Sequence, residues 1–201
     1  DDHPPGSFRA GRFVKSGVTS TTRGCVRKCP WCLVPKYEGA FRTLPIVPGY
    51  IIQDNNLLAA PLLHLCEVFR MLKAQPKAAI FAGGIDVRFV DCVMAGLFQS
   101  IRVKAVFLAA DTDEMLDPLE FAVSQLSFLG REKLRCYVLI GYGDDMPEKA
   151  EARLKRVWRI GCVPYAQLYQ PADQRIRYSQ KWRDLARTWS RPAAMRAELA
   201  P

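Results

Sequence analysis

Three cysteines lie close together near the start of the chain, in the stretch RGCVRKCPWC at residues 23–32. Cys25, Cys29 and Cys32 are separated by steps of four and three residues, in a polar segment that contains a proline. Thiolates grouped in this way bind soft metals or iron–sulfur clusters. The spacing C-x3-C-x2-C therefore predicts a metal centre in a loop.

The number of ligands leaves two inorganic candidates. Structural zinc takes four ligands, usually as two close pairs, and the histidines His3 and His64 stand in no recognisable pairing with the cysteines. Three thiolates around a four-iron cluster leave one iron open, as a catalytic metal centre requires. The pattern favours the cluster, with zinc and an unligated group of thiols as alternatives.

The other cysteines stand in apolar runs. The total of seven is odd, which is a poor basis for a disulfide framework. We expect these four thiols to be small buried apolar side chains: Cys66, Cys92, Cys136 and Cys162. The chain begins without the apolar region of a secretory signal, and no apolar run approaches ~18 residues. We therefore expect a cytoplasmic protein that does not enter the membrane.

Strand-like and helix-like segments alternate along the chain. Expected strands cover 17–22, 49–55, 77–89, 103–111, 133–143 and 162–171; expected helices cover 61–74, 92–101, 115–130 and 147–161, the second-last of these closed by Gly130. Near-continuous apolar strands separated by helices predict an α/β fold with a parallel sheet covered by helices. The six strands form either an open doubly wound sheet or an incomplete barrel, and the pattern does not separate the two.

The 201 residues are expected to form one domain, 1–201. Residues 1–16 form an N-terminal extension in this interpretation. Residues 172–201 form a basic amphipathic C-terminal helix with Trp182, Leu185, Ala186 and Trp189 on one face.

Polar residues follow the expected strands. In both architectures ligands gather at the carboxyl ends of the strands. The segments at those ends are 54–56, 83–88, Asp111, 141–145 and 167–170, together with the cysteine stretch after the first strand. We expect them to converge on one mouth.

The cysteine motif and the segments around it resemble those of a known family. Cys25-x3-Cys29-x2-Cys32, with Trp31 before the last cysteine, resembles the cluster motif of the radical S-adenosylmethionine (radical SAM) superfamily, whose fold is a partial (βα)6 TIM-like barrel. The resemblance runs from about residue 17 to about residue 190. The phrases RGCVRKCPWCLVPKYEG, IIQDNN, GGIDVR and VLIGYGDD are most similar to the cobalamin-binding and methylthiotransferase-like branch, although its accessory domains have no room here.

The resemblance implies a radical enzyme. The three cysteines would bind a [4Fe–4S] cluster, and the fourth iron would bind the amino and carboxylate groups of SAM. Reductive cleavage of SAM would give a 5′-deoxyadenosyl radical that abstracts hydrogen from a substrate.

The resemblance also implies which residues contact SAM. Asp54, Asn55 and Asn56 stand where the family often has Gly-Gly-Glu, and this departure leaves open which of them accepts from the SAM ammonium. An asparagine-rich turn is the structural alternative.

Further contacts follow from the next strand ends. Arg88 would bind the SAM carboxylate, with Asp86 on the same face; a simple Asp–Arg pair is the alternative. Asp111 would accept from the ribose hydroxyls. Gly141, with Gly143, would let the backbone approach the adenine, unless these glycines only end the strand.

The charge pattern suggests partners. Lys and Arg exceed Asp and Glu by 29 − 20 = 9, which suits a polyanion or serves solubility. Arg23, Arg27 and Lys28 around the cysteines would favour thiolates and would receive an acidic electron donor such as a flavodoxin or a ferredoxin. Seven basic residues would line a phosphate track near the C-terminus: Arg175, Arg177, Lys181, Arg183, Arg187, Arg191 and Arg196. A nucleic acid or nucleotide is the preferred substrate, ahead of a peptide or small metabolite.

A different class of function remains open. Because Gly-Gly-Glu and an accessory domain are missing, the chain is alternatively a non-catalytic iron–sulfur protein, or a degenerate SAM-binding module that acts with a partner chain.

Overall fold

The computed structural model describes residues 15–199, so nearly all of the expected N-terminal extension lies outside the described part of the chain. Six strands pair in parallel in the order β1-β4-β5-β6-β7-β8. Their bounds are Val18–Thr19 (β1), Ile51–Ile52 (β4), Ala79–Asp86 (β5), Val103–Ala109 (β6), Leu134–Ile140 (β7) and Val163–Leu168 (β8). The predicted α/β fold with a parallel sheet is confirmed.

The first expected strand divides in two. After β1 the chain turns into β2 (Thr22–Arg23), which pairs antiparallel with β3 (Arg42–Thr43) in a separate small sheet. Thr21, between β1 and β2, gives its backbone N–H to the Asp54 carboxylate at 2.6 Å instead of to a neighbouring strand. The prediction of one strand over 17–22 is therefore wrong.

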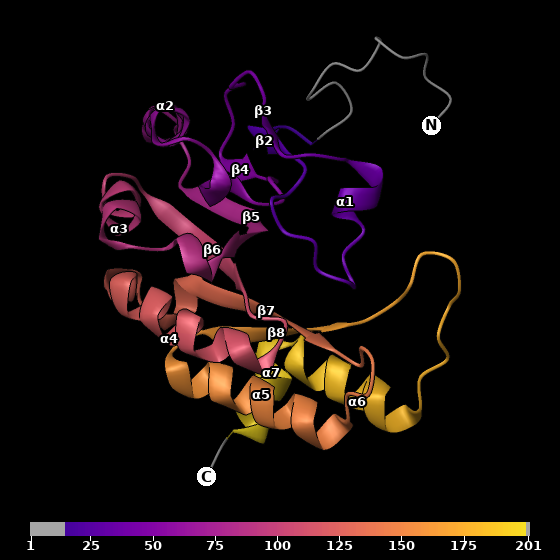
Figure 1. Cartoon of the computed structure of the whole chain (residues 1–201). Helices are drawn as coiled ribbons and strands as arrows, with labels where there is room; N and C mark the ends of the chain where they lie inside the picture. Colours follow the sequence, from indigo (N-terminus) through magenta and orange to yellow (C-terminus); the bar gives the residue numbers. More distant parts are fainter. Residues whose placement is uncertain (1–14, 200–201) are drawn as a thin grey trace.

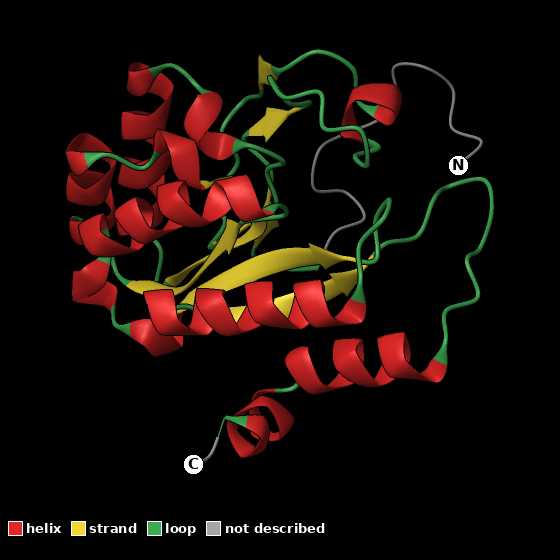
Figure 2. Cartoon of the chain, turned by 60° about the horizontal axis from the view of Figure 1, so that its bottom comes forward, coloured by secondary structure: helices red, strands yellow, loops and turns green. Residues whose placement is uncertain are grey.

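The larger helices cover the outside of the curved sheet, whereas the cysteine stretch lies across its other side (Figures 1 and 2). The helices are α1 (Val34–Tyr37), α2 (Leu62–Lys73), α3 (Cys92–Gln99), α4 (Leu116–Gln125), α5 (Pro147–Ile160), α6 (Gln180–Trp189) and α7 (Pro192–Glu198). Helix α5 has Pro147 in its first turn and ends at Gly161 with φ +114°, as its sequence predicts.

Two helix predictions need correction. Gly130 does not end α4, which stops at Gln125; it follows a short 3-10 turn, Ser127–Leu129. The single C-terminal helix is broken into α6 and α7, because Pro192 cannot continue a helix and restricts the residue before it. The apolar face of α6 is confirmed, since Trp189 is buried and its companions pack against the core.

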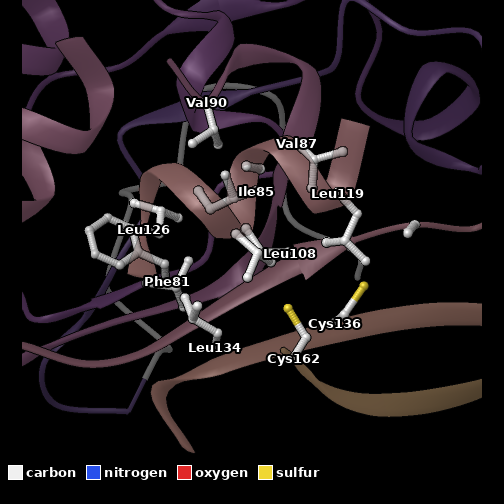
Figure 3. Close-up of a cluster of buried hydrophobic side chains, with 14 of the residues drawn as sticks. Phe81, Ile85, Val87, Val90, Leu108, Leu119, Leu126, Leu134, Cys136 and Cys162 are labelled. Carbon is white, nitrogen blue, oxygen red and sulfur yellow. The ribbon is translucent and has the colours of Figure 1, made fainter. Parts of the chain in front are cut away.

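The core lies between the sheet and the outer helices. Alternate residues of the central strands point into it, among them Leu108 of β6 and Cys136 of β7, and Leu119 and Leu126 meet them from α4 and from the residue after it (Figure 3). The residues between them face the other side of the sheet: Tyr137 stacks there on Phe107 with 4.8 Å between ring centroids. That second side carries the site.

The four remaining cysteines differ in exposure. Cys136 and Cys162 are buried, as predicted, and lie together in the core (Figure 3). Cys66 is half-buried, and Cys92 is exposed. The prediction for Cys92 is wrong because this residue is the first of α3 and follows the capping residue Asp91 at a solvent-facing helix end.

Candidate functional site

A cavity of about 440 Å³ opens at the carboxyl ends of the strands. We call it the cysteine cavity, because Cys25, Cys29 and Cys32 all line it. The strand ends add Asn55, Asn56, Asp86, Arg88, Asp111 and Gln167. The structure thus brings together polar residues from four strand ends and the three cysteines of the loop 23–32, which we call the cysteine loop.

Two glycines of β5 shape the floor of this cavity. A side chain at Gly83 would clash with the backbone oxygen of Asp54, and Gly84 adopts φ +94°, where other residues are strained. The pairing of β5 with β6 shifts register between Phe81 and Ile85, where a β-bulge or another irregularity interrupts the ladder. A bulge next to a site is a common way to redirect a strand.

The rest of the floor comes from residues that the sequence did not single out as ligand contacts. Tyr137 reaches across the sheet, and its hydroxyl donates to the backbone oxygen of Ala82 at 3.1 Å. Ala109 of β6, which pairs with Tyr137, also lines the cavity. Alternation along β7 could have predicted the position of Tyr137. The buried residues of β7 occupy its even-numbered positions, so the odd-numbered Tyr137 faces the cavity side of the sheet.

The sulfur of Cys25 accepts two hydrogen bonds. The backbone N–H of Arg27 lies 3.3 Å from it, and the side-chain amide of Asn56 lies 3.5 Å from it. All three loop cysteines are free and partly exposed. Hydrogen bonds of this kind tune the potential of an iron–sulfur cluster.

Cys29 departs from the expected effect of positive charge. Burial raises the pKa of its thiol, and the charges of Cys32, Asp111 and Cys25 raise it further, although Arg88 lowers it. Nearby arginines are already engaged: Arg23 pairs with Glu38 at 3.2 Å. The prediction that basic neighbours favour the thiolate is wrong for Cys29.

Asp86 is the hub of the charged side of the cavity. Arg88 binds it as a fork, with distances of 2.7 and 3.0 Å, and Arg27 reaches it from the cysteine loop at 3.0 Å. Burial alone would raise the pKa of Asp86, but the hydrogen bonds from both arginines outweigh it, and the pKa is lowered. The Asp–Arg pair that the sequence offered as an alternative is present.

Asp54 points away from the cysteine cavity. It is buried, and its two oxygens accept from the backbone N–H and the hydroxyl of Thr21, each at 2.6 Å. Burial raises the pKa of Asp54, and the Thr21 hydrogen bonds only partly offset this. The carboxylate therefore joins β1 to the end of β4, a role that explains the short first strand.

Asn55 and Asn56 have different surroundings. Asn55 donates to Glu38 at 2.5 Å, and this glutamate also accepts from the backbone N–H of Gly24. No pattern in the sequence predicted a role for Glu38. Asn56 is 2% exposed and donates to Asp86 at 3.3 Å as well as to Cys25. Its oxygen Oδ1 is buried and has no hydrogen-bond partner among the described residues. A buried acceptor without a donor is a place for a ligand N–H.

Asp111 lies at the boundary between two cavities. It and Trp31 line both the cysteine cavity and a neighbouring one of about 290 Å³, to which Tyr142 and Arg153 also contribute. Burial raises the pKa of Asp111, while Trp31 opposes this as a hydrogen-bond donor. The Trp31 ring meets Tyr142 edge-on at 5.4 Å, which fixes it between the cavities.

Gly141 lies outside the residues that line the cysteine cavity. It has φ +75°, and a side chain there would meet the ring of Tyr178 at 3.0 Å. The hydroxyl of Tyr178 lies 2.9 Å from the Gly141 oxygen and 2.8 Å from that of Tyr169. The space beside Gly141, where the adenine was expected, is therefore filled by the side chain of Tyr178.

The donor set of the cysteine cavity contains three free thiols. Within residues 15–199 no three His, Cys, Asp or Glu side chains meet closely enough to bind one metal ion. Three thiolates that each bind a different iron stand further apart than ligands of one ion, and each loop cysteine faces the same cavity. The free thiols and the unpartnered Asn56 oxygen therefore fit a cluster with a ligand beside it.

The chain matches no protein-family model, and no curated protein is similar to it in sequence. Among the described residues, none of the helices has the length and apolar character needed to cross a membrane.

Proposed function

We propose that this protein is a radical SAM enzyme built on a partial (βα)6 TIM-like barrel. The observation that carries the proposal is the gathering of Cys25, Cys29 and Cys32 with four polar strand ends around one cavity. The six parallel strands, with β1 and β8 as the edges, support a barrel that is left open on one side.

Each part of the cavity has a role in this proposal. The three cysteines would hold a [4Fe–4S] cluster, which, when bound, supplies the electron that splits SAM into methionine and a 5′-deoxyadenosyl radical able to take hydrogen from a substrate. The Asn56 amide holds the Cys25 sulfur from one side. Its buried oxygen, which has no partner among the described residues, would accept from the SAM ammonium.

The charged residues would orient the rest of the nucleoside. Two nitrogens of the Arg88 guanidinium already donate to Asp86. A SAM carboxylate bound by Arg88 would therefore share the guanidinium with Asp86. Asp111 stands beside Trp31 where a ribose would lie between the two cavities. Asp54 and Gly141 have partners within the protein, and we assign them structural roles.

One observation favours a second candidate. Both the Asp54 carboxylate and the Arg88 fork, two expected SAM contacts, are occupied by protein groups. A non-catalytic iron–sulfur protein, or a SAM-binding module that needs a partner chain, would also have this arrangement. In either case we propose a cytoplasmic protein reduced by a flavodoxin or a ferredoxin.

Anaerobic reconstitution with iron and sulfide tests the proposal. After SAM and dithionite are added, the enzyme forms 5′-deoxyadenosine, and Cys29→Ala abolishes both cluster binding and product. Cys92→Ala is the matched control, because Cys92 is exposed on α3 and away from the cavity. A full cluster that yields no 5′-deoxyadenosine, with no change of its paramagnetic signal on SAM addition, would instead support the non-catalytic candidate.

A further inference from the structure

Arginines without acidic partners gather beside the edge strand β8. Arg175 and Arg177 come from the loop between β8 and α6, and Arg183 comes from α6 (Figure 1). They line an open pocket of about 550 Å³, which we call the basic pocket. Its other lining residues are Leu168, Gln170, Ile176 and Tyr178, so none of those described there is acidic.

The charge of this pocket is not neutralised by the protein. Of the seven basic residues expected to line a phosphate track, three form ion pairs: Lys181 with Glu148, Arg187 with Asp184, and Arg196 with Glu132. Within residues 15–199 no ion pair involves Arg175, Arg177 or Arg183. The side chain of Gln180 is a neutral partner for Arg183, at 2.7 Å. The seventh residue, Arg191, does not line the pocket, so the predicted track shortens to these three arginines.

The loop that carries the pocket is tied down at two places. Gln170 accepts from the backbone N–H of Ile176 at 2.9 Å and donates to its carbonyl at 3.2 Å. The Tyr178 hydroxyl bonds to the ends of β7 and β8 through Gly141 and Tyr169. Arg175 and Arg177 flank the first tie, so they are positioned before any ligand arrives, which lowers the entropic cost of binding.

The basic pocket adjoins the cysteine cavity. Gln167 of β8 lines the cysteine cavity, and its neighbour Leu168 lines the basic pocket. Because successive strand residues face opposite sides, the two hollows lie on either side of the end of β8. Because β8 is an edge strand, a chain of linked phosphates in the basic pocket would pass round the end of β8 for one of its nucleotides to enter the cysteine cavity.

We infer that the basic pocket binds the phosphates of a single nucleic-acid strand and presents one nucleotide to the cysteine cavity. A guanidinium matches a phosphate as a two-pronged donor, and three of them without carboxylate partners suit linked phosphates. The pocket is concave and has an apolar wall at Ile176, which suits a nucleotide better than the surface of an acidic protein. This names a substrate class, and it rests on the proposed function for the fate of the bound nucleotide.

Binding of a labelled strand tests the inference without cluster or SAM. The probe is a mixed-sequence, fluorescein-labelled single-stranded RNA of about 12 nucleotides, followed by anisotropy with the full chain between about 50 and 200 mM salt. The variant carries Arg175→Gln, Arg177→Gln and Arg183→Gln. The control carries Lys181→Gln, Arg187→Gln and Arg196→Gln, which removes the same charge from residues that are ion-paired.

We expect the pocket variant to bind at least about tenfold more weakly, and its log–log salt slope to fall by about 2, since each lost phosphate contact removes about 0.7. The control retains its affinity within about twofold. Circular dichroism should show that both variants are folded, because the substituted side chains are exposed.

Several results would overturn the inference. An equal loss in both variants would show general charge attraction, and affinity that does not change with salt would exclude phosphate contacts. Competition by polyglutamate as strong as by unlabelled RNA would indicate an acidic protein partner. Competition by a mononucleotide at equal phosphate concentration would indicate a single nucleotide. Because binding and 5′-deoxyadenosine formation are measured separately, each proposal fails on its own result.

Discussion

The side-chain amide of Asn56 donates a hydrogen bond to the sulfur of Cys25 across 3.5 Å, which connects the end of β4 to the cysteine loop. Hydrogen bonds to cysteine sulfur raise the reduction potential of an iron–sulfur cluster. We expect Asn56→Leu to shift the potential of the reconstituted cluster to a more negative value, measured by a redox titration followed by electron paramagnetic resonance.

Asn55→Leu is the matched control for this shift, because Asn55 donates to Glu38 and not to a thiol. The two variants lose the same amide at neighbouring positions. If their potentials change equally, the Asn56 hydrogen bond does not tune the cluster.

Gly84 is expected to tolerate no side chain. Its φ of +94° imposes strain on any other residue, although the nearest atom to a new Cβ would be 3.8 Å away on Tyr137. Gly84→Ala should lower the free energy of unfolding by about 1–3 kcal/mol, measured by urea denaturation. Gly96→Ala, inside α3 where a Cβ meets nothing within 4 Å, should raise it by about 0.5–1 kcal/mol. Equal effects at the two positions would exclude backbone strain as the cause.

The Asp86 hub should make stability depend on pH. Its pKa is lower in the folded chain than the ordinary 3.8, so the carboxylate stabilises the fold above that value, and this contribution is lost as the pH falls through the folded pKa. Asp86→Asn should cost about 1–2 kcal/mol at pH 7, because the side chains of Arg27 and Arg88 are 35% and 38% exposed and solvent screens the pairs.

Urea denaturation of both proteins at several pH values checks this expectation. The difference between them should stay constant well above pH 3.8 and shrink as the pH falls below 3.8 through the folded pKa. Glu120→Gln, which breaks an exposed ion pair with Arg156, should cost little at any pH. A difference between Asp86→Asn and the original chain that stays constant with pH would contradict the role given to the Asp86 charge.

Thiol labelling should separate the cysteines into groups. Burial raises the pKa of Cys162 to about 12, so roughly one thiol in ten thousand is ionised at pH 8, and Cys136 is fully buried. Iodoacetamide at pH 8 should label Cys92 first, spare Cys136 and Cys162, and label the three loop cysteines only when no cluster protects them. Mass spectrometry of digested protein identifies the sites, and early labelling of Cys162 would contradict the buried core.

The sequence predicts much of the scaffold because periodic apolar residues report burial directly. The alternation of strands with helices and the approximate span of α5, with its proline start and glycine end, follow from local pattern, whereas the spatial order of the six strands does not. The C-terminal region shows the limit of the amphipathic pattern, which continues through residues 172–201 although Pro192 interrupts the helix. A continuous helix requires unbroken backbone hydrogen bonding as well as an amphipathic pattern, and Pro192 removes the first.

The site was predictable in position but only partly in detail. Parallel strands end at one edge, so the convergence of the cysteine loop with Asn56, Asp86 and Asp111 follows from topology. Which polar atoms point inward depends on contacts between distant segments, such as Thr21 with Asp54. The spacing of residues along the chain does not predict contacts between distant segments. For the same reason it did not predict the role of Glu38.

The tether at Tyr178 has one further consequence. A phenol has a single hydrogen to donate, yet two carbonyl oxygens lie within reach of it, at 2.9 and 2.8 Å. Only one of them is satisfied at a time, and the hydrogen can pass from one to the other by rotation about the C–O bond. The link between this loop and the sheet therefore survives the loss of either carbonyl oxygen, because the hydroxyl can hold the end of β7 or the end of β8.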